Sequence, residues 1–223
     1  MGLYVETRIR VDLEELWRRT QRPDLHQRWD LRFTEIDYLP LDDPGSPQHF
    51  RYATRLLPGV VVAGTGVSAG ERWRADGTCT SVLRFGSPHP LCPLAEGHGY
   101  WRYVPDGGAV RFLTGYDYAP RWGRIGRIAD RFVVRPLMAW ATAWSFDRLR
   151  LWCERGVTPE RSLIHAWAEV GARVVATGLA VGWAGFGPLA VVTALAAVLL
   201  PPLPSTPAAH RCRYHSRRPK EHR

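Results

Sequence analysis

The first 156 residues alternate apolar and polar positions in short runs. Seven runs have the two-residue period that is typical of strands with one buried face: Tyr4–Val11, Phe33–Leu39, Gln48–Arg55, Val60–Ser68, Thr80–Phe85, Gly97–Val104 and Val110–Tyr118. Turn-forming pairs such as Asp76-Gly77 separate consecutive runs, as in hairpins. The pattern therefore predicts an antiparallel sheet.

Helical spacing appears in three places around these strands. Asp12 is a suitable N-cap for a short helix that follows the first strand, and Pro23 begins a second one that ends near Trp29. The longest helical pattern runs from Trp122 to Cys153, with apolar residues three and four positions apart. Pro136 lacks an N–H group, so we expect it to kink or divide this segment.

A long apolar run follows, from Val174 to Leu200, with 27 residues and no ionisable side chain. Runs of 18 or more such residues are candidates for transmembrane helices. A helix that begins at Pro159, capped by Thr158, is expected to lead into it. Because the segment from Gly185 to Pro188 interrupts the run, a kinked single span and a re-entrant hairpin are both open, and we favour the single span.

The charge is concentrated at the end of the chain. Of the net charge of +9, about five units come from the last 13 residues, Arg211–Arg223. Pro-rich and Arg-rich sequence with little apolar content predicts disorder for residues 201–223. Basic residues beside a membrane segment fit anionic lipid headgroups. No recognition helix or stacking platform accompanies them, so we expect no nucleic-acid partner.

The sequence contains no signal for a metal, a redox centre or secretion. The four cysteines, Cys79, Cys92, Cys153 and Cys212, form no C-x-x-C pair and have no histidine at metal-ligand spacing. The N-terminus has no apolar stretch of signal-peptide length. We therefore expect free thiols, no metal, and a cell-membrane protein whose N-terminal domain is cytoplasmic.

The order of elements resembles that of the START-like, or SRPBCC, superfamily, which includes polyketide cyclases and lipid-transport proteins. The matching segments are Val5–Ile9 with Leu13–Trp17, Pro23–Trp29, Gly99–Tyr103, Arg111–Tyr116 and Asp147–Trp152. The resemblance covers roughly residues 3–155, and it rests on diffuse apolar patterns. Some members of the family resemble this chain in having a membrane-embedded region after the domain.

The resemblance implies an α+β helix-grip fold, in which a curved antiparallel sheet surrounds a long C-terminal helix. Together with the apolar run and the basic tail, it divides the chain into three expected regions: a ligand-binding domain at 1–156, a membrane-associated helical region with a transmembrane helix at 157–200, and the disordered basic tail at 201–223. Side chains two apart share a face of a strand. The aromatic face opposite the charged residues, with Phe132 on the long helix, gives the expected ligand-binding set: Phe50, Tyr52, Trp101, Tyr103, Phe112, Thr114, Tyr116 and Phe132.

The function expected from these features is that of a membrane-anchored binding protein for a hydrophobic small molecule or lipid, with no cofactor. The alternative is a polyketide cyclase-like enzyme or a hydrolase that acts on an aromatic substrate. No catalytic motif is present, so enzymatic activity is the less favoured reading and no catalytic residue is assigned. Tyr52, Tyr103 and Tyr116 are the candidates for a polar group inside the cavity. His26 is expected to lie at the surface or in a loop, and the sequence gives no oligomeric state.

Overall fold

The computed structural model describes residues 2–41, 43, 45–57 and 60–215. It contains one curved antiparallel sheet with the strand order β2-β3-β4-β5-β6-β7-β1-β8. The strands are β1 (Leu3–Ile9), β2 (Glu35–Tyr38), β3 (His49–Leu57), β4 (Val60–Trp73), β5 (Cys79–Gly86), β6 (Leu94–Pro105), β7 (Val110–Pro120) and β8 (Arg213–His215). The seven predicted strands are confirmed, with bounds that differ by a few residues.

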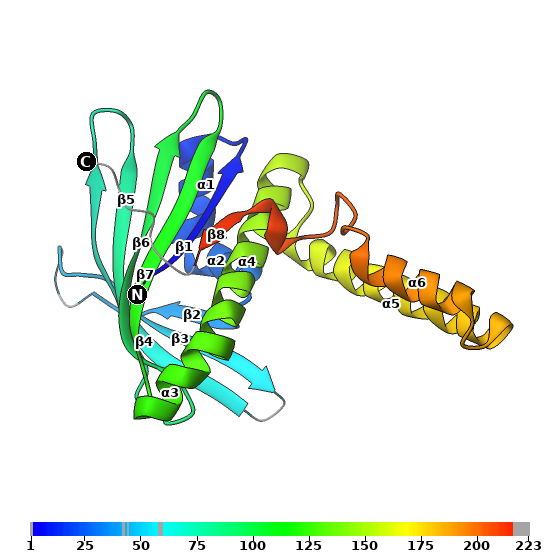
Figure 1. Ribbon diagram of the computed structural model, residues 1–223. Helices are drawn as coiled ribbons and strands as arrows, with labels where there is room; N and C mark the ends of the chain where they lie inside the picture. The colour runs from blue at the N-terminus through cyan, green and yellow to red at the C-terminus, as the bar shows by residue number, and fades with distance from the viewer. Residues whose placement is uncertain (1, 42, 44, 58–59, 216–223) are drawn as a thin grey trace.

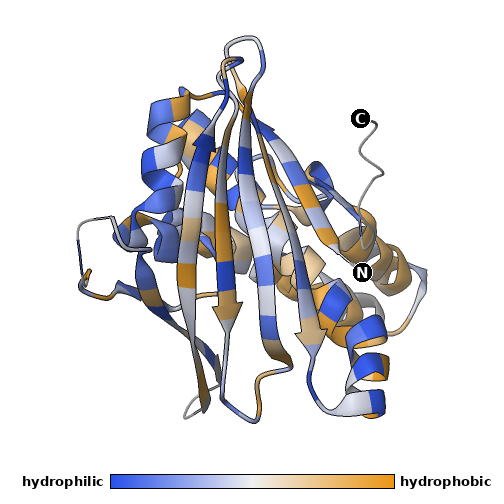
Figure 2. Cartoon of the chain, turned by 90° about the vertical axis from the view of Figure 1, so that its left-hand side faces the viewer, coloured by the Kyte–Doolittle hydropathy of each residue, from blue (hydrophilic) through white to orange (hydrophobic). Residues whose placement is uncertain are grey.

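Helices cover one face of this sheet. After β1 come α1 (Leu13–Gln21) and α2 (Pro23–Trp29). A continuous helical segment follows β7 and consists of α3 (Gly123–Ala129), the π-helical turn η1 (Asp130–Val134) and α4 (Arg135–Arg155). Figure 1 shows α4 lying across the concave side of the sheet, which is the helix-grip arrangement expected from the sequence. Figure 2 shows the opposite face, where apolar and polar positions alternate along the strands.

The break expected at Pro136 takes the form of the π-helical turn directly before it. Proline has no N–H group, and its ring clashes with the carbonyl group four residues earlier in a regular helix. The N–H of Arg135 bonds the carbonyl of Asp130, five residues back. The helix therefore widens at η1 and continues, and α4 is not separated from α3 by a loop.

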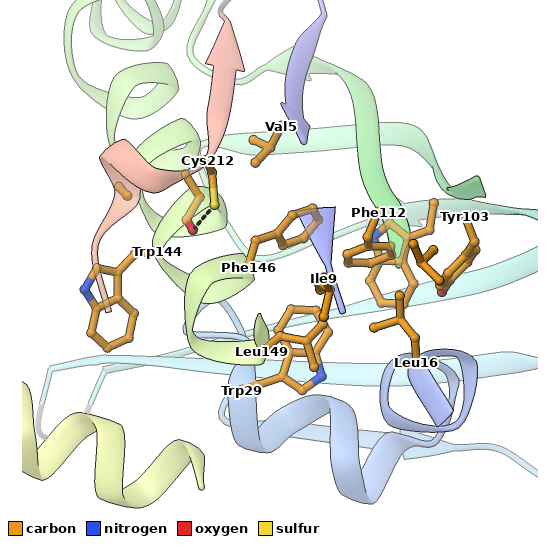
Figure 3. Packing of buried hydrophobic residues seen from close by; sticks show 14 of the residues in the cluster. Val5, Ile9, Leu16, Trp29, Tyr103, Phe112, Trp144, Phe146, Leu149 and Cys212 are labelled. Carbon is orange, nitrogen blue, oxygen red and sulfur yellow. Dashed lines mark hydrogen bonds between the residues drawn. The ribbon is translucent and has the colours of Figure 1, made fainter. Parts of the chain in front are cut away.

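The core lies between α4 and the central strands. Phe112 of β7 and Phe146 of α4 are fully buried, and their rings stack with centroids 4.5 Å apart. Figure 3 shows them facing each other, with Leu16, Trp29 and Leu149 packed around them. Burying large side chains of this kind stabilises a fold by roughly 1.5–3 kcal/mol each.

The expectation of a single transmembrane helix from Val174 to Leu200 is wrong. The chain forms two helices instead, α5 (Pro159–Ala184) and α6 (Pro188–Leu199), which lie side by side as a hairpin (Figure 1). Gly185 has φ 62°, and Pro188 cannot extend the preceding helix. The Thr158 cap and the start at Pro159 are confirmed. Within the described residues, no helix has both the length and the apolar character required to cross a bilayer.

The expectation of disorder is also wrong for residues 201–215. Strand β8 pairs with β1, and the short 3₁₀ turn η2 (Ala209–Arg211) packs against α4. Asp147 of α4 is completely buried and accepts hydrogen bonds from the backbone N–H of Ala208, at 2.9 Å, and from Arg211, at 3.1 Å. The basic, Pro-rich composition of residues 201–215 gave no sign of these hydrogen bonds or of the pairing of β8. Residues 216–223 of the expected tail lie outside the described residues.

Candidate functional site

Most of the predicted ligand-binding residues belong to the packed core. Trp101, Tyr103 and Phe112 are at most 6% exposed. Phe112 contacts both of the others, with ring centroids 5.8 Å from Trp101 and 5.0 Å from Tyr103. Its other neighbour is Phe146. These three side chains therefore pack as core residues.

The hydroxyl groups on the predicted face bond to the protein itself. Tyr103 Oη lies 2.6 Å from Thr20 Oγ1 and accepts from Gln21, and Tyr116 Oη lies 3.1 Å from Thr142 Oγ1. Tyr52 donates to the carbonyl of Gly86 at 3.2 Å. Thr114 donates to the carbonyl of Tyr100 at 2.9 Å.

Phe50 and Tyr52 lie at the other end of the sheet and are only half-buried. Their rings lie flat on β4, where Gly66 and Gly64 leave room: a Cβ atom at Gly64 would fall 2.3 Å from the ring of Tyr52. Phe132, on η1, is 67% exposed. The structure thus divides the predicted set between the core, the open end of the sheet and the helix surface.

A buried polar cluster lies beside the core, and the sequence interpretation missed it. The carboxylate of Asp30 is inaccessible to solvent and binds both Nε and Nη2 of Arg32, at 2.9 and 2.6 Å. His26 Nε2 lies 3.1 Å from Asp30 Oδ2, and its ring packs between Trp29 and Trp101. The spacing of four residues between His26 and Asp30 on one helical turn was the available signal.

The electrostatics of this cluster indicate a structural role. Burial disfavours the charged form of Asp30, but Arg32 overcomes this effect and holds its pKa below the usual range. Burial lowers the pKa of His26 despite the neighbouring carboxylate, so the imidazole is neutral and donates its Nε2 hydrogen to Asp30. Every member of the cluster has a partner, as buried charges require.

A second buried pair fixes the π-helical turn. Asp130 of η1 accepts a short hydrogen bond from Tyr118 Oη and is bound by Arg135 Nη2 at 2.7 Å. Its exposed fraction is 5%. Single π-turns inside α-helices are common at functional sites, and this one holds the adjacent surface of the helix in a defined orientation.

An open pocket lies on the other side of α4, between α4, α5, α6 and the segment 202–207. Its volume is about 570 Å³, within the range of roughly 300–1,000 Å³ that is typical of ligand pockets. Trp144 of α4 forms one wall, and Figure 3 shows its ring directed away from the core aromatics. The remaining wall is mainly aliphatic: Ala166, Val170, Val174, Ala194, Ala197, Val198, Pro202 and Pro207.

Four polar side chains also line the pocket, and they lie on α5 and the returning chain: Glu169, Arg173, Thr177 and Thr206. Arg173 donates to the carbonyls of Ala197 and Leu200 at 2.8 and 2.9 Å, and it pairs with Glu169 through a short contact. Glu169 also accepts from the backbone N–H of Leu203 at 3.1 Å. The pocket therefore has an apolar wall and a polar edge, as an amphiphilic ligand would require.

The hairpin beyond the pocket exposes apolar side chains along both helices. Trp183 and Phe186 at its tip are 92% and 93% exposed, and Val198 on α6 is 81% exposed. No charged residue occurs between Arg173 and the end of α6. A water-soluble surface seldom has a contiguous apolar area of this extent.

Comparison with known proteins identifies one relative by sequence, and solved structures of similar shape with low sequence identity. The chain is 46% identical over 165 residues to the uncharacterized membrane protein YndG of Bacillus subtilis (strain 168); the match covers 74% of this chain and 61% of YndG. The chain thus spans about three fifths of the length of that relative. A search of family models gave no match.

Solved structures of similar shape include a STAR-related lipid transfer protein from Xanthomonas axonopodis, with a TM-score of 0.49 and 16% identity over 67% of this chain and 83% of that chain. The Zhui aromatase/cyclase from Streptomyces sp. R1128 has a TM-score of 0.44 and 12% identity over 67% of this chain and 96% of that chain. TM-scores below 0.5 carry no argument about function. The helix-grip description rests on the strand order and on the position of α4.

Proposed function

We propose that the chain is a membrane-attached binding protein for a hydrophobic small molecule or lipid, and that the ligand occupies the pocket between α4, α5 and α6. The observation that carries this proposal is the open apolar pocket at the foot of an apolar helical hairpin. A ligand in this position can pass between the pocket and a bilayer without entering water. The 46% identical relative is named a membrane protein, which supports the attachment.

The length of the hairpin favours insertion into one half of a bilayer. The uncharged part of α5, from Val174 to Ala184, is 11 residues long, and α6 has 12. At about 1.5 Å per residue these arms reach roughly 16–18 Å, about half of a hydrocarbon core that is ~30 Å thick. The chain then enters the bilayer along α5 and leaves it along α6 on the same side, so the sheet domain and β8 lie on one face of the membrane.

The charge at the base of the hairpin favours the cytoplasmic face. Arg155, Arg161, Arg173, Arg211 and Arg213 lie close in sequence to its two ends. Basic residues beside membrane segments are concentrated on the cytoplasmic side. The proposed location is therefore the cell membrane, with the sheet domain in the cytoplasm.

Native mass spectrometry of the full chain, purified with co-extracted lipid, tests the ligand site. Ala194 lines the pocket and Ala176 is exposed on α5 outside it. Ala194→Trp fills part of the pocket, so we expect it to lose the bound ligand, whereas Ala176→Trp keeps it. Ala197→Leu, a smaller change on the same wall, should weaken binding by an intermediate amount.

Two results would contradict this assignment. Loss of ligand in Tyr52→Ala, with retention in Ala194→Trp, would place the ligand at the aromatic face of the sheet, as expected from the sequence. Absence of ligand from the wild-type chain, under conditions in which it remains folded and in lipid, would overturn the binding function itself.

A further inference from the structure

A row of exposed apolar side chains follows the helical segment after β7. Ile125, Ile128 and Phe132 are 78%, 62% and 67% exposed. Their spacing of three and four residues places them on one stripe of the helix. Trp122, directly before α3, is 49% exposed. This stripe belongs neither to the core nor to the pocket at the hairpin.

Arginines run parallel to this stripe. Arg124, Arg127 and Arg131 are exposed, and each directly precedes an apolar residue of the stripe. Over the described part of the chain, none of the three forms an ion pair; the guanidinium of Arg131 lies 5.3 Å from the centre of the Phe132 ring. Asp130, the one acidic residue between Asp117 and Asp147, is turned inward toward Tyr118. The surface is therefore apolar and positive.

The backbone holds this surface in place. Trp122 has φ 66° and ψ 29°, and a bulky residue stays in the left-handed region only where its surroundings enforce that conformation. Its indole N–H donates to the carbonyl of Pro90 at 3.1 Å. A Cβ atom at Gly126 would lie 1.5 Å from the carbonyl oxygen of Arg121, so only glycine permits this tight start of α3.

We propose that this surface docks on an anionic lipid bilayer. We call it the α3 face and define it by Trp122, Arg124, Ile125, Arg127, Ile128, Arg131 and Phe132. Helices that lie in the membrane interface combine an apolar stripe with flanking basic residues in the same way. Each arginine near an anionic surface adds to the affinity. The contact is separate from the insertion of the hairpin and depends on lipid charge.

Charge distinguishes a bilayer from a second copy of the chain as the occupant. Two copies meeting through this face would bring like-charged arginine rows together, with no exposed acid on the face to offset them.

An environment-sensitive NBD fluorophore on Ile125→Cys tests the proposal in the full chain. Burial raises the pKa of the Cys153 and Cys212 thiols to about 12 and that of Cys79 to about 11, so these native thiols react slowly at neutral pH. Vesicles of phosphatidylcholine, with and without phosphatidylglycerol, are the probe. Matched labels on Ala75→Cys, in the exposed β4–β5 turn, and on Phe186→Cys report bulk solvent and the hairpin tip.

We expect the label at position 125 to move into lipid only with phosphatidylglycerol, and to return to water at high salt. Arg124→Gln/Arg127→Gln/Arg131→Gln should weaken this local contact by about 100-fold and leave the label at position 186 in lipid. A label at position 125 that stays in water while the label at position 186 is buried would overturn the α3 face alone. Burial that follows protein concentration, without vesicles, would overturn it in favour of a second copy.

Discussion

Arg173 Nη1 on α5 lies 2.8 Å from the carbonyl oxygen of Ala197 on α6. The same guanidinium reaches the carbonyls of Leu200 and Pro201. The last carbonyls of a helix have no partner within it, so Arg173 satisfies groups that would otherwise be unpaired where α6 ends. One side chain thus connects the two arms of the hairpin and forms part of the pocket edge.

Arg173→Met should therefore loosen the hairpin and leave the sheet domain intact. Hydrogen bonds to charged groups contribute about 1.5–3 kcal/mol each, so we expect amide exchange in α6 to accelerate by at least about 10-fold. Hydrogen exchange followed by mass spectrometry measures this change peptide by peptide. Arg161→Met, on the exposed surface of α5, is the control. Unchanged exchange in α6 would show that Arg173 does not hold the arms together.

Asp147 anchors the end of the chain to α4. Replacing it with Asn removes the charge that pairs with Arg150 and Arg211, and it leaves two arginines without their buried partner. The free energy of unfolding should fall by about 3–5 kcal/mol, and protease should cut the segment 205–215 faster. Glu14→Gln, on the exposed surface of α1, should change neither. Equal stability of the Asp147→Asn and Glu14→Gln variants in urea would contradict the anchoring role.

Phe112 and Trp144 are both buried aromatic residues of the core cluster, but only Trp144 also lines the pocket. Phe112→Ala deletes a fully buried ring from the stack with Phe146 and should lower the free energy of unfolding by about 3–5 kcal/mol. Trp144 is 8% exposed, so Trp144→Ala should cost a similar amount of stability and should in addition weaken ligand retention. Urea unfolding and native mass spectrometry of both variants make the comparison. Equal ligand retention in the two variants would show that Trp144 does not form a wall of the ligand site.

Trp140 and Trp144 of α4 have different surroundings, although they lie four residues apart on one helix. Trp140 is 46% exposed, and Trp144 faces α5. A helix with apolar residues on several sides packs against more than one partner, and the sequence does not tell which side meets the sheet. The contact of α4 with α5 and the 202–207 segment decides the orientation, and it depends on residues distant in sequence.

The strands and short helices could be predicted because their signals are local. Alternation, turn pairs such as Asp76-Gly77, and the Thr158–Pro159 cap act within a few residues. The position of the pocket could not be predicted, because the pocket forms only where α4, the hairpin and the returning segment 202–207 meet. The strand β8 was missed for a related reason: its three residues, Arg213–His215, are exposed and pair with β1 at the far end of the sequence.

His26 predicts a dependence of stability on pH. Burial keeps the pKa of His26 below its ordinary value of 6.5, so the unfolded chain binds a proton at this position at a higher pH than the folded chain. The stability that the neutral side chain of His26 contributes is fully present above pH 6.5 and is lost as the pH falls below that value. His26→Gln should remove that part of the decline between about pH 7 and pH 5, whereas His98→Gln, at an exposed position, should not. Parallel declines in all three proteins would contradict the buried, neutral state of His26.

Insertion of the hairpin into lipid is the central claim, and flotation of the full chain with phosphatidylcholine vesicles tests it most directly. Trp183→Asp/Phe186→Asp places two charges at the tip, and Val61→Asp/Val82→Asp places two at exposed apolar positions of the sheet. Burying one large apolar side chain is worth roughly 1.5–3 kcal/mol, so the tip variant should lose at least about 100-fold in partitioning. The wild-type chain and the sheet variant should float with the vesicles while the tip variant stays behind. Equal flotation of all three proteins, or failure of the wild-type chain to float, would contradict attachment through the hairpin.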